Sequence, residues 1–221
     1  MKPAFYAGAG GGWRDYVTLL HPPYTLWHLS YVVLGAALAS EVRLDRLAGT
    51  LVAFFLGLGV GVHALDELNG RPLRTEIHQG VLRALAVVGL GGAVALGLAA
   101  AATVGPGLYV FMAVGVALAL AYPLELAGGR LHSDLWFALG WGAFPVLTGA
   151  FASGGSITTA AVAGAAYAVA LSFAQRRLST WVRGIRRRGA AGELDAGEAA
   201  LRWLTATAVL VALTALAVRL V

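Results

Sequence analysis

Cysteine is absent from this chain, and charged residues are scarce. Zero cysteines exclude disulfide bonds and metal sites built on thiolates. Only 12% of the 221 residues are charged, about half of the roughly 25% usual in a soluble domain. The sequence also has no Walker loop, no HExxH and no GxSxG motif. The net charge is +5, but the basic residues lie in loops between apolar runs, so we expect no nucleic-acid partner.

Long apolar runs are what the chain does have. Leu47–Leu65 carries no formal charge, and neither do the 41 residues of Ala84–Leu124 or the 41 of Leu135–Gln175. Each longer run is broken near its middle by turn residues, "VGPG" and "SGGS". About 20 apolar residues cross a bilayer as a helix. The sequence therefore predicts an all-α, polytopic membrane bundle, a single integral membrane domain over residues 1–221, with about seven transmembrane helices near 22–40, 47–68, 82–103, 106–124, 134–152, 157–177 and 198–218.

Basic residues set the expected orientation of these seven spans. Thirteen Lys and Arg residues fall on the side of the N-terminus, whereas Arg43, Arg46 and Arg219 fall on the other side. Basic loops stay cytoplasmic. We therefore expect a cytoplasmic N-terminus and an outer C-terminus. The first 20 residues lack the pattern of a secretory signal. High Ala, Gly and Arg content with almost no Lys suggests the cytoplasmic membrane of a prokaryote.

The stretch "GVHALDELNGRPLRT", Gly61–Thr75, closes the second predicted span. His63, Asp66 and Glu67 share one helix face because they are spaced i, i+3 and i+4. Two carboxylates could hold Mg²⁺ through oxygen ligands, and His63 could position a substrate or accept a proton. Arg71 and Arg74 follow in a turn, and guanidinium groups suit phosphate. The alternative is an ordinary interfacial helix end whose arginines follow the positive-inside rule.

Two further polar stretches lie on the same predicted side. "SFAQRRLSTWVRGIRRRG", Ser172–Gly189, could bind a diphosphate or, equally, anionic lipid headgroups. "YPLELAGGRLHSD", Tyr122–Asp134, is typical of a solvated loop, although its His132 and Asp134 lie close to the fifth predicted span and are too few to indicate a reaction. The substrate-binding candidates from the three stretches are Arg71, Arg74, Arg130, Gln175, Arg176, Arg177 and Ser179.

The order of these stretches resembles that of the UbiA superfamily of intramembrane prenyltransferases. "HPPYTLWHLSYVVLGAALA", His21–Ala39, is similar to the family's first helix, and Gly61–Thr75 looks like its first aspartate-rich motif. Ala121–Phe151 is similar to the passage from the fourth to the fifth helix, and Leu171–Gly189 falls where the second aspartate-rich motif stands. The resemblance covers about residues 14–218.

This resemblance implies a helical bundle around a cavity open to lipid, and transfer of a prenyl group from its diphosphate to a lipophilic acceptor. It implies Mg²⁺ held by acidic residues, here Asp66 and Glu67, with His63 beside them. The chain departs from the family in three ways. The family's first motif begins with Asn-Asp and carries further aspartates, whereas here His63, Asp66 and Glu67 stand there with Asn69 beyond. The second motif has no carboxylate, since Gln175, Arg176, Arg177 and Ser179 stand there, and seven predicted spans are two fewer than the usual nine.

Two functions follow from these expectations. The first is a divergent prenyltransferase in which arginines replace part of the metal charge. The second is a non-catalytic UbiA-like protein that binds a quinone, pigment or other isoprenoid, or that serves as a subunit of a larger membrane complex. Membrane lipids and a prenyl diphosphate or other isoprenoid are the expected partners.

Overall fold

The computed structural model describes residues 4–7, 10–189 and 191–221, and this part of the chain is all-helical. Helix makes up 79% of the structure, and the described residues contain no strand. The predicted all-α class is confirmed. The elements in chain order are α1 (Trp13–Leu19), α2 (Pro22–Ala37), α3 (Leu44–Phe54), η1 (Phe55–Val62), α4 (His63–Leu68), α5 (Gln79–Val104), α6 (Leu108–Ala121), α7 (Asp134–Ala138), η2 (Leu139–Ala143), α8 (Phe144–Gly154), α9 (Thr159–Arg188) and α10 (Ala191–Leu220).

Membrane character is visible in the length and composition of the helices. Among the described residues, four helical stretches are long and apolar enough to cross a bilayer: Leu44–Leu68, Gln79–Val104, Asp134–Gly154 and Gly192–Leu220. Helix α6 is apolar but shorter. Helix α2 has only 16 residues, and α9 ends in three arginines, so neither belongs to this set. A membrane protein is therefore supported, while the number of seven spans stays a prediction.

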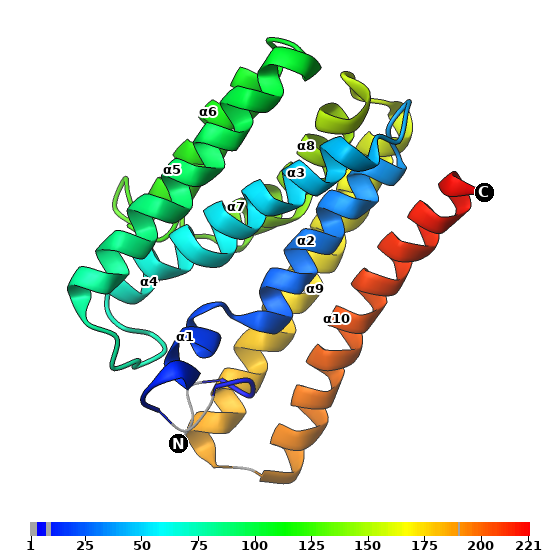
Figure 1. Ribbon diagram of the computed structural model, residues 1–221. Coiled ribbons are helices and arrows are strands. Elements are labelled where there is room, and N and C mark those ends of the chain that lie inside the picture. Colours follow the sequence, from blue (N-terminus) through cyan, green and yellow to red (C-terminus); the bar gives the residue numbers. More distant parts are fainter. Residues whose placement is uncertain (1–3, 8–9, 190) are drawn as a thin grey trace.

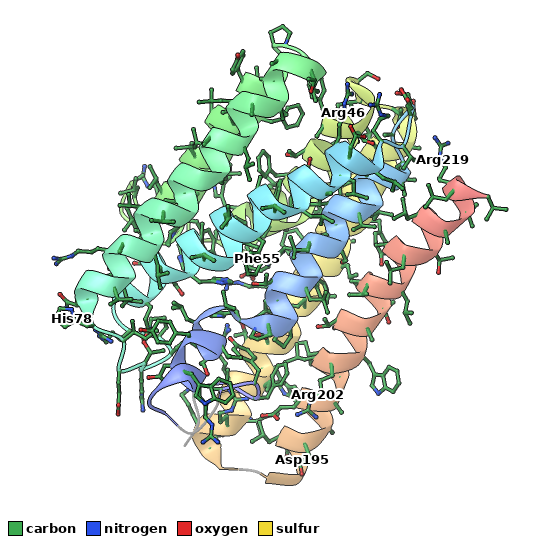
Figure 2. All side chains as sticks on the ribbon, viewed as in Figure 1. Arg46, Phe55, His78, Asp195, Arg202 and Arg219 are labelled. Atoms are coloured by element: carbon green, nitrogen blue, oxygen red, sulfur yellow. The ribbon has the colours of Figure 1, made fainter. Side chains whose placement is uncertain are left out.

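The two ends of the bundle differ in their chain connections (Figure 1). The loop end holds the N-terminus and the segments 69–78 and 122–133, which meet where Asn69 Nδ2 donates to the Pro123 carbonyl at 2.8 Å. The turn end holds the short connections 38–43, 105–107 and 155–158 and the C-terminus. Figure 2 shows His78, Asp195 and Arg202 toward the loop end, and Arg46 and Arg219 toward the turn end.

Three side chains, those of Arg46, Ser153 and Arg219, hold the turn end together through hydrogen bonds. Arg46 donates to the carbonyls of Ser153 at 3.0 Å and Thr103 at 2.9 Å, so one guanidinium joins α3, α5 and α8. The Ser153 hydroxyl donates to the Glu41 carbonyl at 3.0 Å and accepts from the backbone N–H of Arg43. Arg219 adds α10 by donating to the carbonyl of Ala39 at 3.1 Å. These contacts satisfy backbone groups that the helix ends leave open.

Helices α2 and α8 approach each other backbone to backbone. A Cβ atom at Gly35 would meet the Val146 carbonyl group, and one at Gly149 would meet the carbonyl of Val32. Only glycine allows this reciprocal contact. Small residues permit such close packing between helices in lipid, where no hydrophobic force drives association. The core around this pair is correspondingly well packed, with Trp27 and Tyr31 of α2 buried against α8, α9 and α10.

Two π-helical segments, which are wider than an α-helix, interrupt two of the long helical stretches near their middles. Segment η1 lies between α3 and α4, and η2 lies between α7 and α8. Such segments leave carbonyl groups without their ordinary α-helical partners, and they are common at functional sites. Here histidines take up these carbonyls: His63 Nδ1 lies 3.2 Å from the Gly59 carbonyl, and His28 Nδ1 lies 2.8 Å from that of Trp141. The π segments thereby fix two imidazole rings.

Candidate functional site

A polar cavity of about 520 Å³ opens at the loop end, among α2, α4, the 122–132 segment, η2 and α9. Five of the residues predicted from sequence line it: His63, Asp66, Gln175, Arg176 and Ser179. The cavity therefore brings together the Gly61–Thr75 and Ser172–Gly189 stretches, and residues of Tyr122–Asp134 line it as well. The other five predicted residues, Glu67, Arg71, Arg74, Arg130 and Arg177, do not line it.

Histidines occupy the wall of the cavity nearest α2. The rings of His21 and His63 are stacked with centroids 4.1 Å apart and planes at 25°. A carbonyl only accepts hydrogen bonds, so Nδ1 of His63 carries a proton and, in the neutral ring, Nε2 is the basic atom. The same reasoning leaves Nε2 of His28 as an acceptor. His21 lies at the start of α2, and burial, followed by the nearby His28, lowers its pKa to about 4. His21 is therefore neutral at pH 7.

Asp66 presents its carboxylate to the same cavity from α4. In the described part of the chain, no group donates a hydrogen bond to this carboxylate. Its electrostatic neighbours include His132, Glu67 and Glu125. His132 is stacked on Tyr122 with centroids 4.3 Å apart, and its Nδ1 lies 3.9 Å from Glu125. Asp66 therefore remains open to a ligand in the cavity.

Glu67 points into the protein instead of the cavity. Its side chain is fully buried, and both carboxylate oxygens accept hydrogen bonds from the loop that follows α4. Oε2 accepts from the backbone N–H of Leu73 at 2.9 Å. Oε1 accepts from the backbone N–H of Thr75 at 2.8 Å and from the Thr75 hydroxyl at 2.9 Å. Glu67 thus holds the shape of the 69–78 loop.

The four remaining arginines from the sequence analysis also lie outside the cavity. Arg71 donates to the carbonyls of Thr75 at 2.6 Å and Ile77 at 3.0 Å, so it braces the same loop as Glu67. Arg74 and Arg130 are exposed. Arg177 is also exposed, with its Nε 3.7 Å from Asp134. We therefore do not keep these four residues in the candidate substrate site.

Helix α9 forms the basic wall of the cavity. Arg176 donates from Nε to Asp134 at 3.0 Å, and its guanidinium lies 5.1 Å from the centre of the Phe137 ring. Arg183, two turns further along, donates to the hydroxyls of Ser179 at 3.1 Å and Thr180 at 3.0 Å. These residues recur at i, i+3 or i+4, and i+7, so they follow one face of the helix.

Several residues that line the cavity were absent from the sequence-based candidates. They are Tyr6, His21, Tyr122, Arg183 and Arg186. The signal for Arg183 was present, because it lies seven residues after Arg176 in a basic helix. No local signal marks Tyr6 or His21, because their role depends on the N-terminal segment folding back so that the Tyr6 hydroxyl lies 2.7 Å from Nδ1 of His21. Burial raises the pKa of Tyr6, so its hydroxyl keeps the proton.

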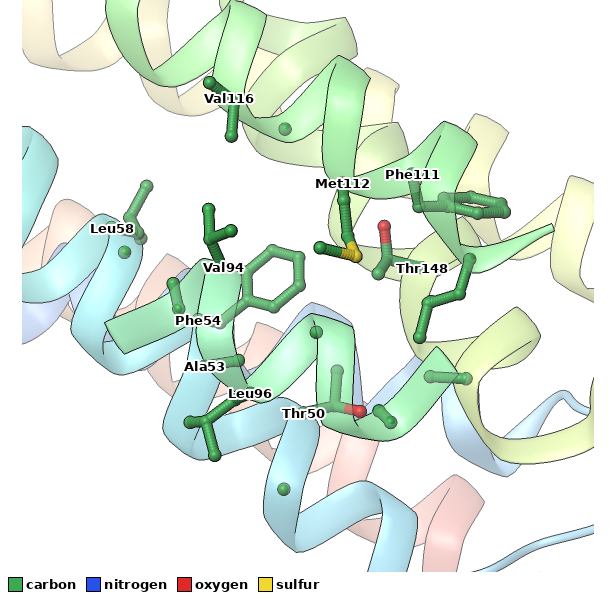
Figure 3. A pocket seen from close by; sticks show the side chains of 18 of the residues that line it. Thr50, Ala53, Phe54, Leu58, Val94, Leu96, Phe111, Met112, Val116 and Thr148 are labelled. Carbon is green, nitrogen blue, oxygen red and sulfur yellow. The ribbon is translucent and has the colours of Figure 1, made fainter. Parts of the chain in front are cut away.

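A second, apolar pocket of about 380 Å³ lies next to the polar cavity, on the side of the turn end. Figure 3 shows Phe54, Val94, Met112 and Val116 around it. The two hollows share three lining residues, which are Leu58 and Val62 of η1 and Trp141 of η2. The π-helical segments therefore border the junction between a polar compartment and an apolar one.

The residues present do not fit the metal clamp that the resemblance implies. Asp66 is available, but both oxygens of Glu67 are committed to the loop. Within the described ranges, no group of three or more His, Asp or Glu side chains is arranged to hold a metal ion. We therefore assign no Mg²⁺ to the site and derive no chemical step through one.

Comparison with known proteins gives no relative from which a function could be transferred. No protein-family model, no curated protein and no solved structure matches the chain. Fold and cavity together define an all-helical protein with apolar, membrane-length helices and a polar cavity beside an apolar pocket. The UbiA resemblance stays a prediction.

Proposed function

We propose that this protein binds a prenyl diphosphate and transfers the prenyl group to a lipophilic acceptor, as a divergent UbiA-like membrane prenyltransferase. The observation that carries the proposal is the junction at Leu58, Val62 and Trp141, where a charged cavity meets an apolar pocket. A ligand with an anionic head and a hydrocarbon tail matches both compartments at once. The expected orientation, with the loop end at the cytoplasmic face, would present the cavity to a donor arriving from that side.

The apolar pocket has the dimensions of a chain-binding site. Its lining on α5 runs from Leu90 to Val104, which spans about 21 Å at the 1.5 Å helical rise per residue. Arg46 and Thr103 lie at the far end of this lining, in the fastened turn end. An extended hydrocarbon chain could lie along this lining.

The chain's own residues suggest how transfer would proceed. The allylic carbon–oxygen bond breaks, and its electron pair leaves with the diphosphate. The acceptor then forms a new bond to the allylic carbon and loses a proton. The basic wall of α9 would offset the charge of the leaving diphosphate. His63 Nε2, whose lone pair is left free by the Nδ1–Gly59 contact, would take the acceptor's proton. The Asp66 carboxylate, which lines the same cavity, would offset part of the positive charge that develops there.

One observation favours a second candidate, an isoprenoid-binding protein without transferase activity. Glu67 occupies the place of a motif carboxylate but serves the loop, and the second motif has no carboxylate at all. A protein that had lost catalysis would keep the cavity and the pocket while losing these acids. Such a protein would bind a quinone, a pigment or another isoprenoid, alone or as a subunit of a larger membrane complex.

Turnover separates the two candidates. Purified protein in nanodiscs is incubated with a radiolabelled prenyl diphosphate and a panel of quinone and phenol acceptors, with Mg²⁺ and without it, beside the Asp66→Ala and His63→Gln variants. Release of diphosphate together with a prenylated acceptor, lost in both variants, supports transfer. Retention of the intact prenyl diphosphate, or of an isoprenoid that co-purifies with the protein, supports the binder. Absence of any isoprenoid binding would overturn both candidates.

A further inference from the structure

Two buried polar atoms in the polar cavity lack a partner. Nε2 of His21 and the hydroxyl of Tyr122 are both buried, and neither makes a hydrogen bond in the described structure. Both residues line the cavity. Leaving a buried polar group unpaired costs about 1–3 kcal/mol, so such atoms call for an explanation. When Tyr6 donates to Nδ1 of His21, the Nε2 atom carries the proton and is an unused donor, as is the hydroxyl of Tyr122.

Arginines of α9 lie within electrostatic reach of these two groups. The hydroxyl of Tyr122 interacts electrostatically with both Arg176 and Arg183. The hydroxyl of Tyr6, which contacts His21, interacts electrostatically with Arg183 and Arg186. Arg183 is therefore the cation that lies near both the Tyr122 hydroxyl and Tyr6, the hydrogen-bond partner of His21. It also lies close enough to Arg176 for the two positive charges to repel each other. Among the described residues, no carboxylate lies within ion-pair distance of Arg183, whose two hydrogen bonds go to neutral hydroxyls.

The charge on this wall is predominantly positive even after its ion pairs are counted. Asp134 is shared by Arg176 and Arg177, and Glu198 is shared by Arg186 and Arg202. Arg177 and Arg202 do not line the cavity, so three guanidinium groups, those of Arg176, Arg183 and Arg186, face it against the two paired carboxylates. The acidic residues of the cavity itself, Asp66 and Glu125, belong to α4 and to the 122–132 segment. The cavity therefore has a basic wall and an acidic wall, and an anion would bind at the basic one.

We propose that the wall formed by α9 binds the diphosphate of an isoprenoid directly, without a divalent cation between protein and ligand. Arg183 and the terminal nitrogens of Arg176 donate to phosphate oxygens, and His21 Nε2 and the Tyr122 hydroxyl complete the donor set. Arginine forks give charge-assisted, geometrically specific contacts with phosphate. This inference deepens the proposed function and rests on it, since it specifies how the polar head is held.

Binding of a labelled geranylgeranyl diphosphate to the protein in phosphatidylcholine nanodiscs provides the test. Affinity is measured in excess EDTA and again with Mg²⁺, for the wild type, Arg183→Gln, Arg183→Lys and the matched control Arg187→Gln. Arg187 lies one turn further along α9, is exposed and does not line the cavity. The melting temperature of each variant shows that it is folded.

We expect binding in EDTA, weakened about tenfold or more by Arg183→Gln, and less by Arg183→Lys because the charge is kept. Arg187→Gln should bind like the wild type. Binding that appears only with Mg²⁺, or equal losses in Arg183→Gln and Arg187→Gln, would overturn the direct-contact site while leaving the proposed function intact. Displacement of the label by phosphatidylglycerol would reassign the site to lipid headgroups and overturn it. Failure of every prenyl diphosphate to bind in both conditions would overturn the proposed function as well.

Discussion

Replacing Glu67 distinguishes a carboxylate that shapes a loop from one that holds a metal. Glu67→Gln changes one oxygen into an amide nitrogen and little else. Oε1 can still accept the two hydrogen bonds from Thr75, but the new amide N–H₂ then faces the backbone N–H of Leu73, which loses its acceptor. Glu67→Ala removes all three hydrogen bonds and leaves two buried backbone donors and one hydroxyl without a partner.

The expected losses follow from this count of contacts. A hydrogen bond to a charged group contributes about 1.5 kcal/mol or more, so Glu67→Ala should lower the free energy of unfolding by about 4 kcal/mol. Glu67→Gln, with one donor left unpaired, should cost about 2 kcal/mol. Thr75→Val removes only the hydroxyl contact and should cost about 1 kcal/mol. The order of the three variants is the sharper prediction, because it depends on which oxygen serves which donor.

Thermal unfolding in nanodiscs, followed by tryptophan fluorescence, measures this order. For a chain of this size, about 2 kcal/mol corresponds to a drop in melting temperature of roughly 6 °C. Isoprenoid binding is measured on the same samples, well below the melting temperature, with EDTA and with Mg²⁺. The interpretation is refuted if Glu67→Gln melts like the wild type yet loses a Mg²⁺-dependent gain in binding, because that result belongs to a metal ligand.

Three further predictions concern packing, the tail pocket and pH. Gly149→Ala should lower the melting temperature sharply, because its new methyl group would overlap a backbone carbonyl of α2, whereas Gly91→Ala meets open space and should be neutral or slightly stabilising. Ala100→Phe fills the far part of the apolar pocket and should weaken binding of geranylgeranyl diphosphate more than binding of the shorter geranyl diphosphate. The control Ala102→Phe lies on the exposed face of α5 and should leave the binding of both ligands unchanged. Folding lowers the pKa of His21 from 6.5 to about 4, so between these values the unfolded chain binds a proton that the native protein does not. The free energy of unfolding should therefore drop by about 1.4 kcal/mol between pH 7.5 and 5.5. The variant His21→Gln should lose this part of the pH dependence of the melting temperature.

Each of these predictions has an outcome that contradicts it. Equal melting of the two glycine variants would mean that α2 and α8 do not touch as described. Equal loss of both ligands in Ala100→Phe would mean that the tail does not extend along α5. A pH dependence of melting that is the same in His21→Gln and in the wild type would mean that His21 is accessible to protons in the native state.

Hydrophobic patterning predicted the helices well, because an apolar stretch of membrane length has few other stable conformations. The predicted span near 82–103 lies inside α5, and the one near 134–152 matches Asp134–Gly154 closely. The acidic face was harder to predict. Successive residues on an α-helix project about 100° apart, so Asp66 can face the cavity while Glu67 points into the loop, and the i, i+3, i+4 spacing alone could not separate them.

Tertiary contacts explain the residues that sequence reasoning missed or misplaced. His21 enters the site because the segment 4–7 folds back over it, which no periodicity indicates. Arg71 lies outside the site because its guanidinium donates hydrogen bonds to the carbonyls of Thr75 and Ile77. In both cases the deciding partner is a backbone or side-chain group whose position depends on the folded loop, and a pattern of residue types does not contain that position.

The contacts that Arg46 and Arg219 make at the turn end bear on how firmly the helices are held together there. Arg46 joins α3 to backbone carbonyls of α5 and α8, and Arg219 joins α10 to the carbonyl of Ala39. Each is a hydrogen bond from a charged donor, and separating the helices at this end would break it at a cost of about 1.5 kcal/mol or more. Two guanidinium groups thus tie together helices that are far apart in the sequence, without a single disulfide.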